Sequence, residues 1–407
     1  MPNRKQFIIQ SAGAFGGLMA IDSIFARAAR AAGNVSSAGS PAQRSLVVVN
    51  LQGGNDGLNT VVPYGDPEYY RGRPSIAIAA ADVLKLDGDI GLNPRLAALK
   101  ALYDERRVAI LQGVHYPNPN LSHFRSTEIW QTAAPDRYLT TGWAGRFLDS
   151  AASPAKNLFK GVAIGPVLPK MMVADKTDVP ALADVRGFRF GGARQEQARA
   201  DAILNGDGNR YSFDSPYLQL IQDVARDARA ASSQLPHLVS GYKSAVEYPK
   251  TPFAQGLNLI SAIVNADLGT KVFYVSLGSF DTHVGQRRRQ DVLLEQFAGG
   301  LKAFYDDLGA HHTDDRVLTM TFSEFGRRVN ENADGGTDHG TAAPMFLVGG
   351  NAKGGLYGDH PSLSDLNFGN LKWHTDFRSV YATVCERWLG VKADAILGGS
   401  FPTLNFV

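Results

Sequence analysis

The sequence predicts an α/β fold in which helices flank a doubly wound, mostly parallel sheet. Short β-branched runs that lack an apolar–polar alternation are typical of buried strands in a parallel sheet. Such runs stand at 46–49, 108–111, 272–275, 317–320 and 345–348. Segments between them carry apolar residues at spacings of three and four, which indicates helices that lie on the sheet.

Three of these helical segments have clear boundaries or faces. The segment 93–102 opens with Asn-Pro, an N-cap followed by a first-turn proline. The segment 294–308 repeats Leu and Phe at helical spacing, and 377–388 does the same before Gly390, which we expect to end that helix. Cys385 is the chain's single cysteine, so an intramolecular disulfide and a thiolate-rich metal site are both excluded.

The N-terminal residues 1–31 resemble an export signal of the twin-arginine type. Arg4 and Lys5 precede a short apolar stretch and small residues, with Lys5 where the second arginine usually stands. The stretch is too short and too polar for stable membrane insertion. We expect recognition by the export machinery and a periplasmic or secreted product, with residues 32–44 as a linker. Residues 45–407 then form the α/β domain, with a helical and loop insertion at about 150–270.

The charge distribution excludes nucleic acid as a partner. The 407 residues carry a formal net charge of +2, of which residues 1–31 hold +3. The remaining chain is therefore close to neutral and lacks the basic surface that a phosphate backbone requires.

Acids, imidazoles and a hydroxyl stand at the strand ends, where ligands bind in open α/β sheets. The predicted metal ligands are Asp56, Asp281, His283, Glu324, Asp338 and His339. Asp338 and His339 precede a strand, whereas the others follow one. Carboxylates combined with imidazoles suit zinc or manganese, whereas an all-oxygen set would suit calcium.

Ser122 is the predicted nucleophile because it opens a helix, where the free backbone N–H groups favour an anion. A metal-bound serine could attack an ester, and Arg125 or Arg327, with Arg328 as a further choice, could hold an anionic substrate as a fork. Each residue also has a structural interpretation: Ser122 as a helix cap, Asp56 as a turn residue and Glu324 as an arginine partner. A Gly-x-Ser-x-Gly elbow and nucleotide-binding loops are absent from the sequence.

Five motifs resemble the family catalogued as domain of unknown function 1501. They are Asn50–Gly57, Ser122–Phe124, Phe280–His283, Ser323–Arg328 and Gly336–Gly340. That family is placed in the alkaline phosphatase and sulfatase superfamily, so the resemblance implies an alkaline-phosphatase-like fold.

The resemblance also implies residue roles. Asp56 takes the place of the first metal ligand and Ser122 that of the nucleophile. Asp281 and His283 resemble a later ligand pair, and His339 the last histidine. Phe325 stands where the second site would need a histidine, so the resemblance implies one firm metal site, on Asp281, His283 and His339, and a weakened second site.

Two functional hypotheses follow. The first is an exported metal-dependent hydrolase that takes small phosphate or sulfate esters. The second is a non-catalytic exported binding or assembly protein on a degenerate phosphatase-like scaffold, which the phenylalanine at 325 favours.

Overall fold

The computed structural model describes residues 43–151, 157–182, 235 and 239–407. Within these residues, nine strands form the main sheet, in the order β11-β5-β10-β9-β1-β8-β6-β7, with β14 paired to β5. The strands are β1 (Ser45–Leu51), β5 (Val108–His115), β6 (Gly161–Ile164), β7 (Ala181–Leu182), β8 (Val272–Leu277), β9 (Val317–Phe322), β10 (Ala343–Gly349), β11 (Gly355–Tyr357) and β14 (Thr375–Asp376). The five predicted strands are thus all present, and the mostly parallel α/β fold is confirmed.

The prediction for the last of the five runs was wrong in direction. β10 pairs antiparallel with both β5 and β9, whereas β1 pairs parallel with β8 and β9. A run of buried apolar residues reports burial on both faces and says nothing about direction. The reversal brings the beginning of β10 to the edge at which the parallel strands end.

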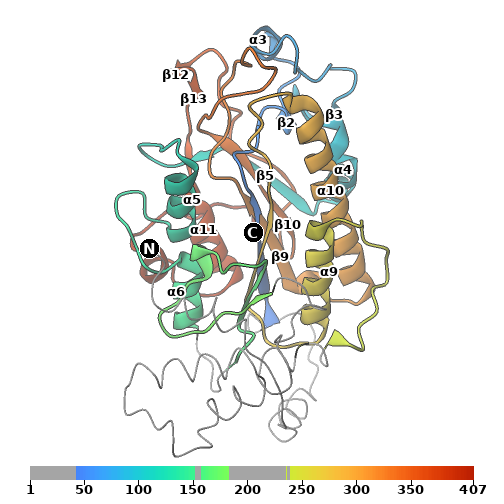
Figure 1. Cartoon of the computed structure of the whole chain (residues 1–407), viewed down its shortest axis with the longest axis vertical. Coiled ribbons are helices and arrows are strands. Elements are labelled where there is room, and N and C mark those ends of the chain that lie inside the picture. Colours follow the sequence, from blue (N-terminus) through green and yellow to red (C-terminus); the bar gives the residue numbers. More distant parts are fainter. Residues whose placement is uncertain (1–42, 152–156, 183–234, 236–238) are drawn as a thin grey trace, which may run out of the picture.

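Helices cover both faces of the sheet (Figure 1). One face packs against α4 (Ala97–Asp104), α9 (Pro252–Asn265) and α10 (Gln286–Ala310), and the other against α5 (His123–Thr132), α6 (Trp143–Ser150) and α11 (Phe377–Thr383). In β1, Val47 and Val49 join the first core while Leu46 and Val48 join the second. This alternation follows from the two-residue repeat of a strand that is buried on both sides.

The predicted helix boundaries agree with the structure. Asn93 accepts a hydrogen bond from the N–H of Arg95 at the start of a 3-10 turn (Pro94–Leu96) that leads into α4. α11 continues as a π-helical segment (Val384–Trp388), and Gly390 follows with a φ of 72°. α12 (Asp394–Leu397) lies near the C-terminus. None of the described helices has both the length and the hydrophobicity needed to cross a bilayer.

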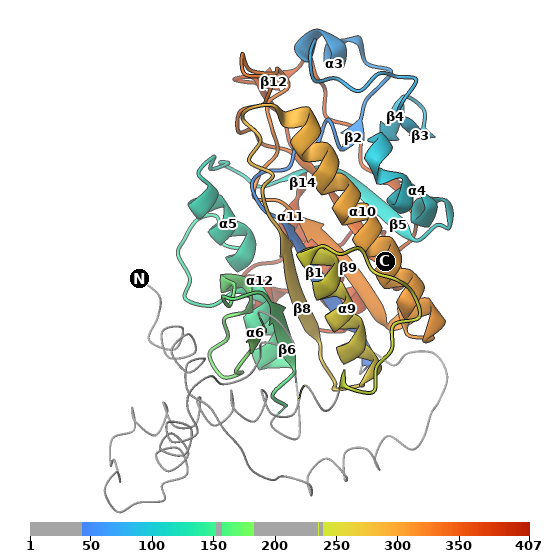
Figure 2. The ribbon, with the colours of Figure 1, turned by 45° about the vertical axis from the view of Figure 1, so that its right-hand side comes forward.

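A smaller layer covers the end of the sheet where the parallel strands finish (Figure 2). It contains α3 (Pro67–Gly72), a three-stranded sheet of β2 (Val61–Val62), β3 (Leu84–Asp87) and β4 (Ile90–Leu92), and a hairpin of β12 (Leu366–Asn367) and β13 (Asn370–Leu371). Its own apolar cluster includes Leu58, Tyr69 and Leu363.

Three predicted segments fall wholly or partly on residues that the structure does not describe. The export signal at 1–31 and most of the linker at 32–44 lie outside the described residues, as does much of the insertion at about 150–270. The described parts of that insertion include β6 and β7, which extend the main sheet, and α9, which packs on it.

Candidate metal centre

Four chain segments meet at the carboxyl edge of the parallel strands. Asp281 and His283 follow β8, Glu324 follows β9, His123 opens α5 after β5, and His339 precedes β10. His339 reaches this edge because β10 runs antiparallel to its neighbours. The sheet topology therefore gathers residues that are far apart in sequence.

Three imidazoles turn their Nε2 atoms toward the carboxylate of Asp281. The Nε2 atoms of His283 and His339 lie 3.1 and 3.3 Å from Asp281 Oδ1, and that of His123 lies 3.3 Å from Asp281 Oδ2. One ligand atom each from His123, Asp281 and His339 falls within a spread of 4.8 Å, so these residues could hold one cation.

The Nδ1 atom of each imidazole faces an acceptor. The Nδ1 atom of His123 lies 2.9 Å from Glu324 Oε1, that of His339 lies 2.8 Å from the Leu121 carbonyl oxygen, and that of His283 lies 3.3 Å from Asp338 Oδ1. Carbonyl and carboxylate oxygens only accept hydrogen bonds, so a neutral imidazole with its proton on Nδ1 satisfies each of these oxygens and leaves a lone pair on Nε2. Metal-binding histidines in proteins are held in this way.

The Nε2 atoms themselves fit a cation. His123 Nε2 is buried and has no hydrogen-bond partner among the described residues, although it faces a carboxylate oxygen. His283 Nε2 and His339 Nε2 are 2.9 Å apart. Two lone pairs at that distance repel unless a proton or a cation lies between them, and ligand atoms of His123, His339 and Asp281 lie close enough to share one cation.

Glu324 lies behind His123, although it was predicted among the metal ligands. Its carboxylate is buried, and Oε1 and Oε2 accept hydrogen bonds of 2.9 and 3.0 Å from the Gly53 N–H. Because Oε1 also receives the His123 Nδ1 proton, Glu324 orients the imidazole.

Asp338 holds an equivalent place behind His283, with Nδ2 of Asn332 at 3.3 Å from the same Oδ1. The hydrogen bond from Asn332 holds the pKa of Asp338 below its usual range.

Arg327 positions Asp281 and is not free to hold a substrate, contrary to the prediction. Its guanidinium is buried and donates to Asp281 Oδ1 at 2.7 Å, to the Thr337 carbonyl oxygen at 2.8 Å and to that of Gly54 at 2.7 Å. Burial raises the pKa of Asp281, but the hydrogen bond and charge of Arg327 outweigh this effect and hold the pKa below its usual range.

Arg125 was also predicted to bind the substrate, and the structure turns it elsewhere. Its guanidinium bonds Glu128 at 3.0 Å and the Pro135 carbonyl oxygen at 3.1 Å, and it stacks on Tyr138 at 4.0 Å from the ring centre. Arg328 is exposed and interacts electrostatically with Asp338. No hydrogen bond or ion pair holds its guanidinium within the described part of the chain, so Arg328 is the arginine available to an anion.

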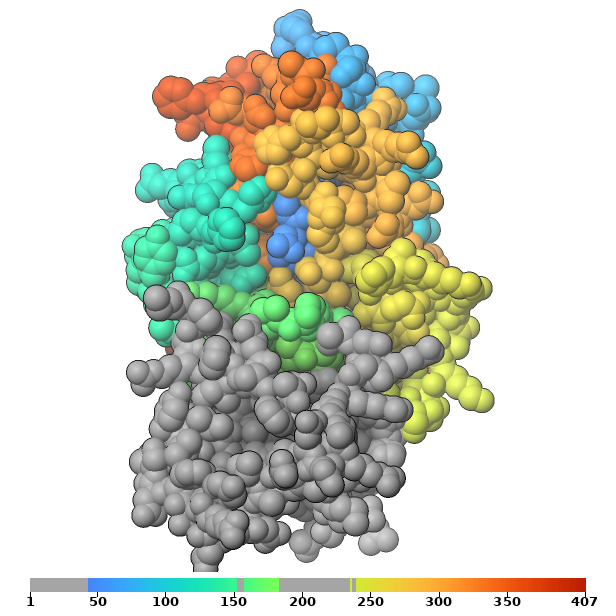
Figure 3. Space-filling model, viewed as in Figure 1, coloured from blue at the N-terminus to red at the C-terminus, as the bar shows by residue number. Residues whose placement is uncertain are grey.

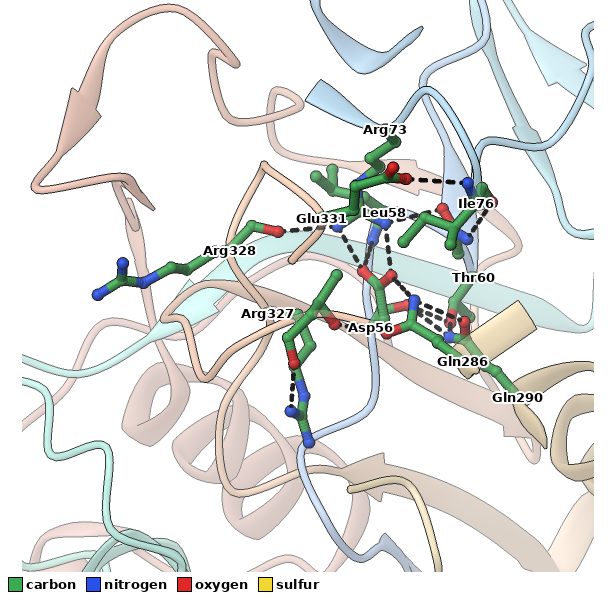
Figure 4. A network of polar contacts seen from close by, with 12 residues as sticks. Asp56, Leu58, Thr60, Arg73, Ile76, Gln286, Gln290, Arg327, Arg328 and Glu331 are labelled. Atoms are coloured by element: carbon green, nitrogen blue, oxygen red, sulfur yellow. Dashed lines mark hydrogen bonds and ion pairs between the residues drawn. The ribbon is translucent and has the colours of Figure 1, made fainter. Parts of the chain in front are cut away.

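Asp56 does not join the three imidazoles, contrary to the prediction. It forms a buried ion pair with Arg73, and both side chains are fully buried (Figure 4). Its oxygens accept four hydrogen bonds, two from Arg73, one from the N–H of Leu58 and one from Gln286 Nε2. Protein donors therefore occupy the lone pairs that a metal would need.

Ser122 lies beside the centre. It occupies the N-cap position of α5, it is exposed, and its side chain makes no capping hydrogen bond. Its two chain neighbours both touch the centre, because His123 contributes an imidazole and the Leu121 carbonyl oxygen accepts from His339. The backbone of Ser122 therefore adjoins the centre, and the residue stands at a helix N-terminus, which favours negative charge.

Phe325, which the sequence resemblance puts in the position of a second-site histidine, packs against two of the imidazoles. It is buried, and its ring centre lies 4.8 Å from that of His123 and 4.5 Å from that of His339. A Cβ on Gly54 would collide with this ring, so the glycine makes room for it. Elsewhere among the described residues, no other group of three such ligands comes close enough to share an ion.

His123 is the residue that the sequence reasoning missed as a ligand. The signal was present, because it stands next to Ser122 at the end of a predicted strand. The expectation that ligands lie at strand ends applies to His123 as well as to Ser122, the predicted nucleophile.

The solved structures that resemble this chain are distant. They include the lipoteichoic acid synthase LtaP from Listeria monocytogenes (12% identity, TM-score 0.38, 88% of this chain and 75% of that chain). The PsFucS1 sulfatase from Pseudoalteromonas sp. has 12% identity and a TM-score of 0.38 over 100% of this chain and 75% of its own. A protein in the alkaline phosphatase superfamily from Vibrio parahaemolyticus has 9% identity and a TM-score of 0.38 over 98% of this chain and 78% of its own. These similarities assign no residue role here.

No similar sequence was found among curated proteins. A family model matches residues 114–389, a span that contains His123, Asp281, His283 and His339. The chain belongs to the family described as "Protein of unknown function (DUF1501)".

Proposed function

We propose that this protein is a metal-dependent hydrolase of phosphate or sulfate esters. The observation that carries the proposal is the convergence of three Nε2 atoms on the Asp281 carboxylate, with the exposed Ser122 directly before His123 in the chain. The Nδ1 hydrogen bonds make these imidazoles ready to bind a cation without changing tautomer. The five motifs that resemble the phosphatase and sulfatase superfamily support the same chemistry.

In this proposal His123, His283, His339 and Asp281 hold the cation. Such a cation, when bound, polarises an ester oxygen and lowers the pKa of a neighbouring hydroxyl. Ser122 supplies the nucleophilic oxygen at the N-terminus of α5, where backbone N–H groups stabilise negative charge. Arg328 binds the anionic oxygens of the substrate, and Arg327 keeps Asp281 ionised.

The donor set favours zinc or manganese over calcium. Imidazole nitrogens suit transition metals, whereas calcium prefers six to eight oxygen ligands. The expectation of calcium therefore has little support in this geometry, in which three of the four donors are nitrogen.

Metal analysis of the purified protein tests the cation site. We expect about one equivalent of transition metal per chain, lost in Asp281→Ala and kept in Asp136→Ala, a matched control whose carboxylate is exposed and pairs with its neighbour Arg137. Equal metal content in both variants would overturn the assignment of the cluster.

Turnover of aryl phosphate, aryl sulfate and phosphodiester substrates tests the nucleophile. Ser122→Ala is expected to keep the metal and to lose at least about a hundredfold in kcat, since it removes the attacking atom and leaves the cation ligands in place. Unchanged turnover in this variant would exclude Ser122 as the nucleophile.

A non-catalytic binding or assembly protein is the second candidate. Phe325 favours it, because an apolar ring occupies the side of the centre where a second cation would otherwise sit. Tightly held metal with no turnover on any of the three substrate classes would support this candidate and count against the hydrolase.

Export is a further part of the proposal. The basic pair, the apolar stretch and the small residues within 1–31 support delivery by the export machinery to the periplasm or the medium. Fractionation of cells that express the whole chain, with Arg4→Gln/Lys5→Gln as the comparison, tests it, and retention of both proteins in the cytoplasm would contradict it.

A further inference from the structure

Four exposed apolar side chains belong to segments that adjoin the candidate metal centre, contact α5 or cover the same end of the main sheet. Phe124, Tyr138, Val284 and Phe368 are 91%, 75%, 53% and 92% exposed, and we call them the apolar rim. Only two other large apolar side chains of the described residues are comparably exposed, Val167 and Val292. Most of the strongly exposed apolar side chains in the described part of the chain thus gather at one site, which is unusual for a protein surface.

Chain connectivity places Phe124 and Val284 at the centre. Phe124 follows His123 directly, and Val284 follows His283 directly. Consecutive Cα atoms are about 3.8 Å apart, so each of these side chains starts one residue from an imidazole. The guanidinium of Arg125, in the first turn of α5, lies 4.0 Å from the ring centre of Tyr138, which places Tyr138 against α5.

The β12–β13 hairpin, which carries Phe368 in its turn, covers the same end of the main sheet. The Thr341 hydroxyl donates to the Leu371 carbonyl oxygen, which ties β13 to a residue two positions after His339. Figures 1 and 2 both show this hairpin above α5, at the same end and side of the main sheet. Figure 3 shows the hairpin segment, in orange-red, and the α5 segment, in blue-green, on the same face of the molecule.

The backbone of Phe368 is unfavourable for an aromatic residue. Phe368 has a φ of 51° and Gly369 a φ of 81°, the left-handed pair of a two-residue hairpin turn. Asn or Gly is preferred at the first of these positions, because a bulky side chain is strained there. The ring is 92% exposed, so the fold gains no burial in return. Strain held without a packing benefit indicates a functional role.

The rim surrounds polar groups that suit an anion. Ser122 and Arg328 are both exposed at the centre, and the Arg328 side chain extends away from the Asp56 network (Figure 4). We propose, resting on the hydrolase function above, that the natural substrate is an amphiphilic ester. Its anionic head lies at Arg328 and the metal centre, while a long alkyl or acyl group lies across the apolar rim.

Binding of two probes to the metal-loaded protein tests the proposal independently of turnover. Dodecyl phosphate, kept below its micelle concentration, and ethyl phosphate share a head and differ only in the chain. We expect the dodecyl ester to bind at least about tenfold more tightly by calorimetry, since covering one aromatic side chain is enough for such a gain. Equal affinities would overturn the proposal.

Variants of the rim locate the binding surface. Phe368→Asn suits the turn and Phe124→Ser lies in an exposed first turn, so neither is expected to unfold the protein. Each should lower dodecyl phosphate affinity about tenfold and leave that of ethyl phosphate unchanged. Val167→Ser, an exposed apolar residue beyond β6, is the matched control and should change neither affinity. Loss of affinity in the control but not in the rim variants would contradict the proposal.

The two proposals fail in different ways. If Asp281→Ala keeps both its metal and its activity, the hydrolase assignment fails, even where dodecyl phosphate still binds at the rim. If metal content and turnover behave as expected while the rim variants bind both esters like the wild type, the amphiphilic substrate is excluded and the hydrolase remains.

Discussion

Glu324 shows how one side chain can determine the chemistry of another. Its carboxylate faces His123 Nδ1 and accepts hydrogen bonds from the Gly53 N–H at both oxygens. This arrangement favours the tautomer of His123 that leaves Nε2 unprotonated. Glu324→Gln removes the charge and offers a donor where an acceptor is needed. We expect metal affinity to fall about 10–100-fold, the usual cost of losing such a partner. Competition with a chromophoric chelator measures this, and Glu105→Gln, at an exposed carboxylate, should match the wild type.

The Asp56–Arg73 pair gives a prediction about stability. Both side chains are fully buried, and removing one partner leaves an uncompensated charge. Arg73→Met should lower the free energy of unfolding by about 3–5 kcal/mol in denaturant titrations.

An exposed pair provides the comparison for Arg73→Met. Lys372→Met breaks the Lys372–Asp365 pair and should cost under about 1 kcal/mol. The double variant Asp56→Asn/Arg73→Met should recover part of the loss, because no buried charge remains. A cost for Arg73→Met as small as that of Lys372→Met would contradict the assignment of a buried pair.

The sequence predicted which residues come together more successfully than it predicted the role of each residue. Asp281, His283 and His339 meet as expected, whereas Asp56 pairs with Arg73 and Arg327 bonds to Asp281 instead of being free for a substrate. Arg73 lies 17 residues from Asp56 and Gln286 lies 230 residues away. The local sequence does not show partners that are so far apart in the chain. The Asp-Gly turn at Asp56 is therefore compatible both with a metal ligand and with a buried partner of an arginine.

At the scale of elements, the β12–β13 hairpin makes a stability prediction. Phe368→Asn places a residue that tolerates positive φ in front of Gly369. The free energy of unfolding should rise by about 1 kcal/mol, because the strained aromatic side chain is removed from a left-handed position. Thermal denaturation measures the change. Phe124→Asn, at an equally exposed phenylalanine in the helix α5, should give no gain, and a gain in both would indicate a general surface effect.

β10 shows why strand direction could not be derived from the sequence. Its apolar run resembles those of β1 and β9, and all three are buried. Direction depends on which connection the chain takes between strands, and that is settled by packing of the whole sheet. The position of Asp338 and His339 before the strand was the one available hint, since they could join the other ligands only if the strand were reversed.

At the scale of the whole molecule, the two cores were predictable because burial on both faces removes polar residues from the strands. Val47 and Leu46 of β1 point into opposite cores, and each core is completed by helices with the expected spacing. Short strands such as β6 and β7, at one end of the sheet order, carry too few residues to show a pattern. They are recognised only through their pairing with β8 and with each other.

The buried side chain of His115 makes the stability of the folded protein depend on pH. It is fully buried at the end of β5, its ring centre lies 4.4 Å from that of Tyr116, and neither ring nitrogen has a hydrogen-bond partner among the described residues. Burial lowers the pKa of His115 to about 3, from 6.5. Between about pH 6.5 and pH 3, His115 therefore binds a proton in the unfolded chain but stays neutral in the folded protein. Stability is complete above about pH 6.5 and falls as the pH drops, by about 1.4 kcal/mol per unit.

Urea titrations of the metal-free protein at pH 7 and pH 5 test this linkage. The wild type should lose about 2 kcal/mol between the two conditions through this group, because one proton is taken up on unfolding over most of that interval. His115→Phe replaces the imidazole with an apolar ring that suits the neighbouring aromatic residues. Between pH 7 and pH 5 the free energy of unfolding of this variant should fall by about 2 kcal/mol less than that of the wild type. His312→Asn, at an exposed imidazole, should retain the wild-type dependence. An unchanged pH dependence in His115→Phe would show that His115 is charged, or already paired, in the folded protein.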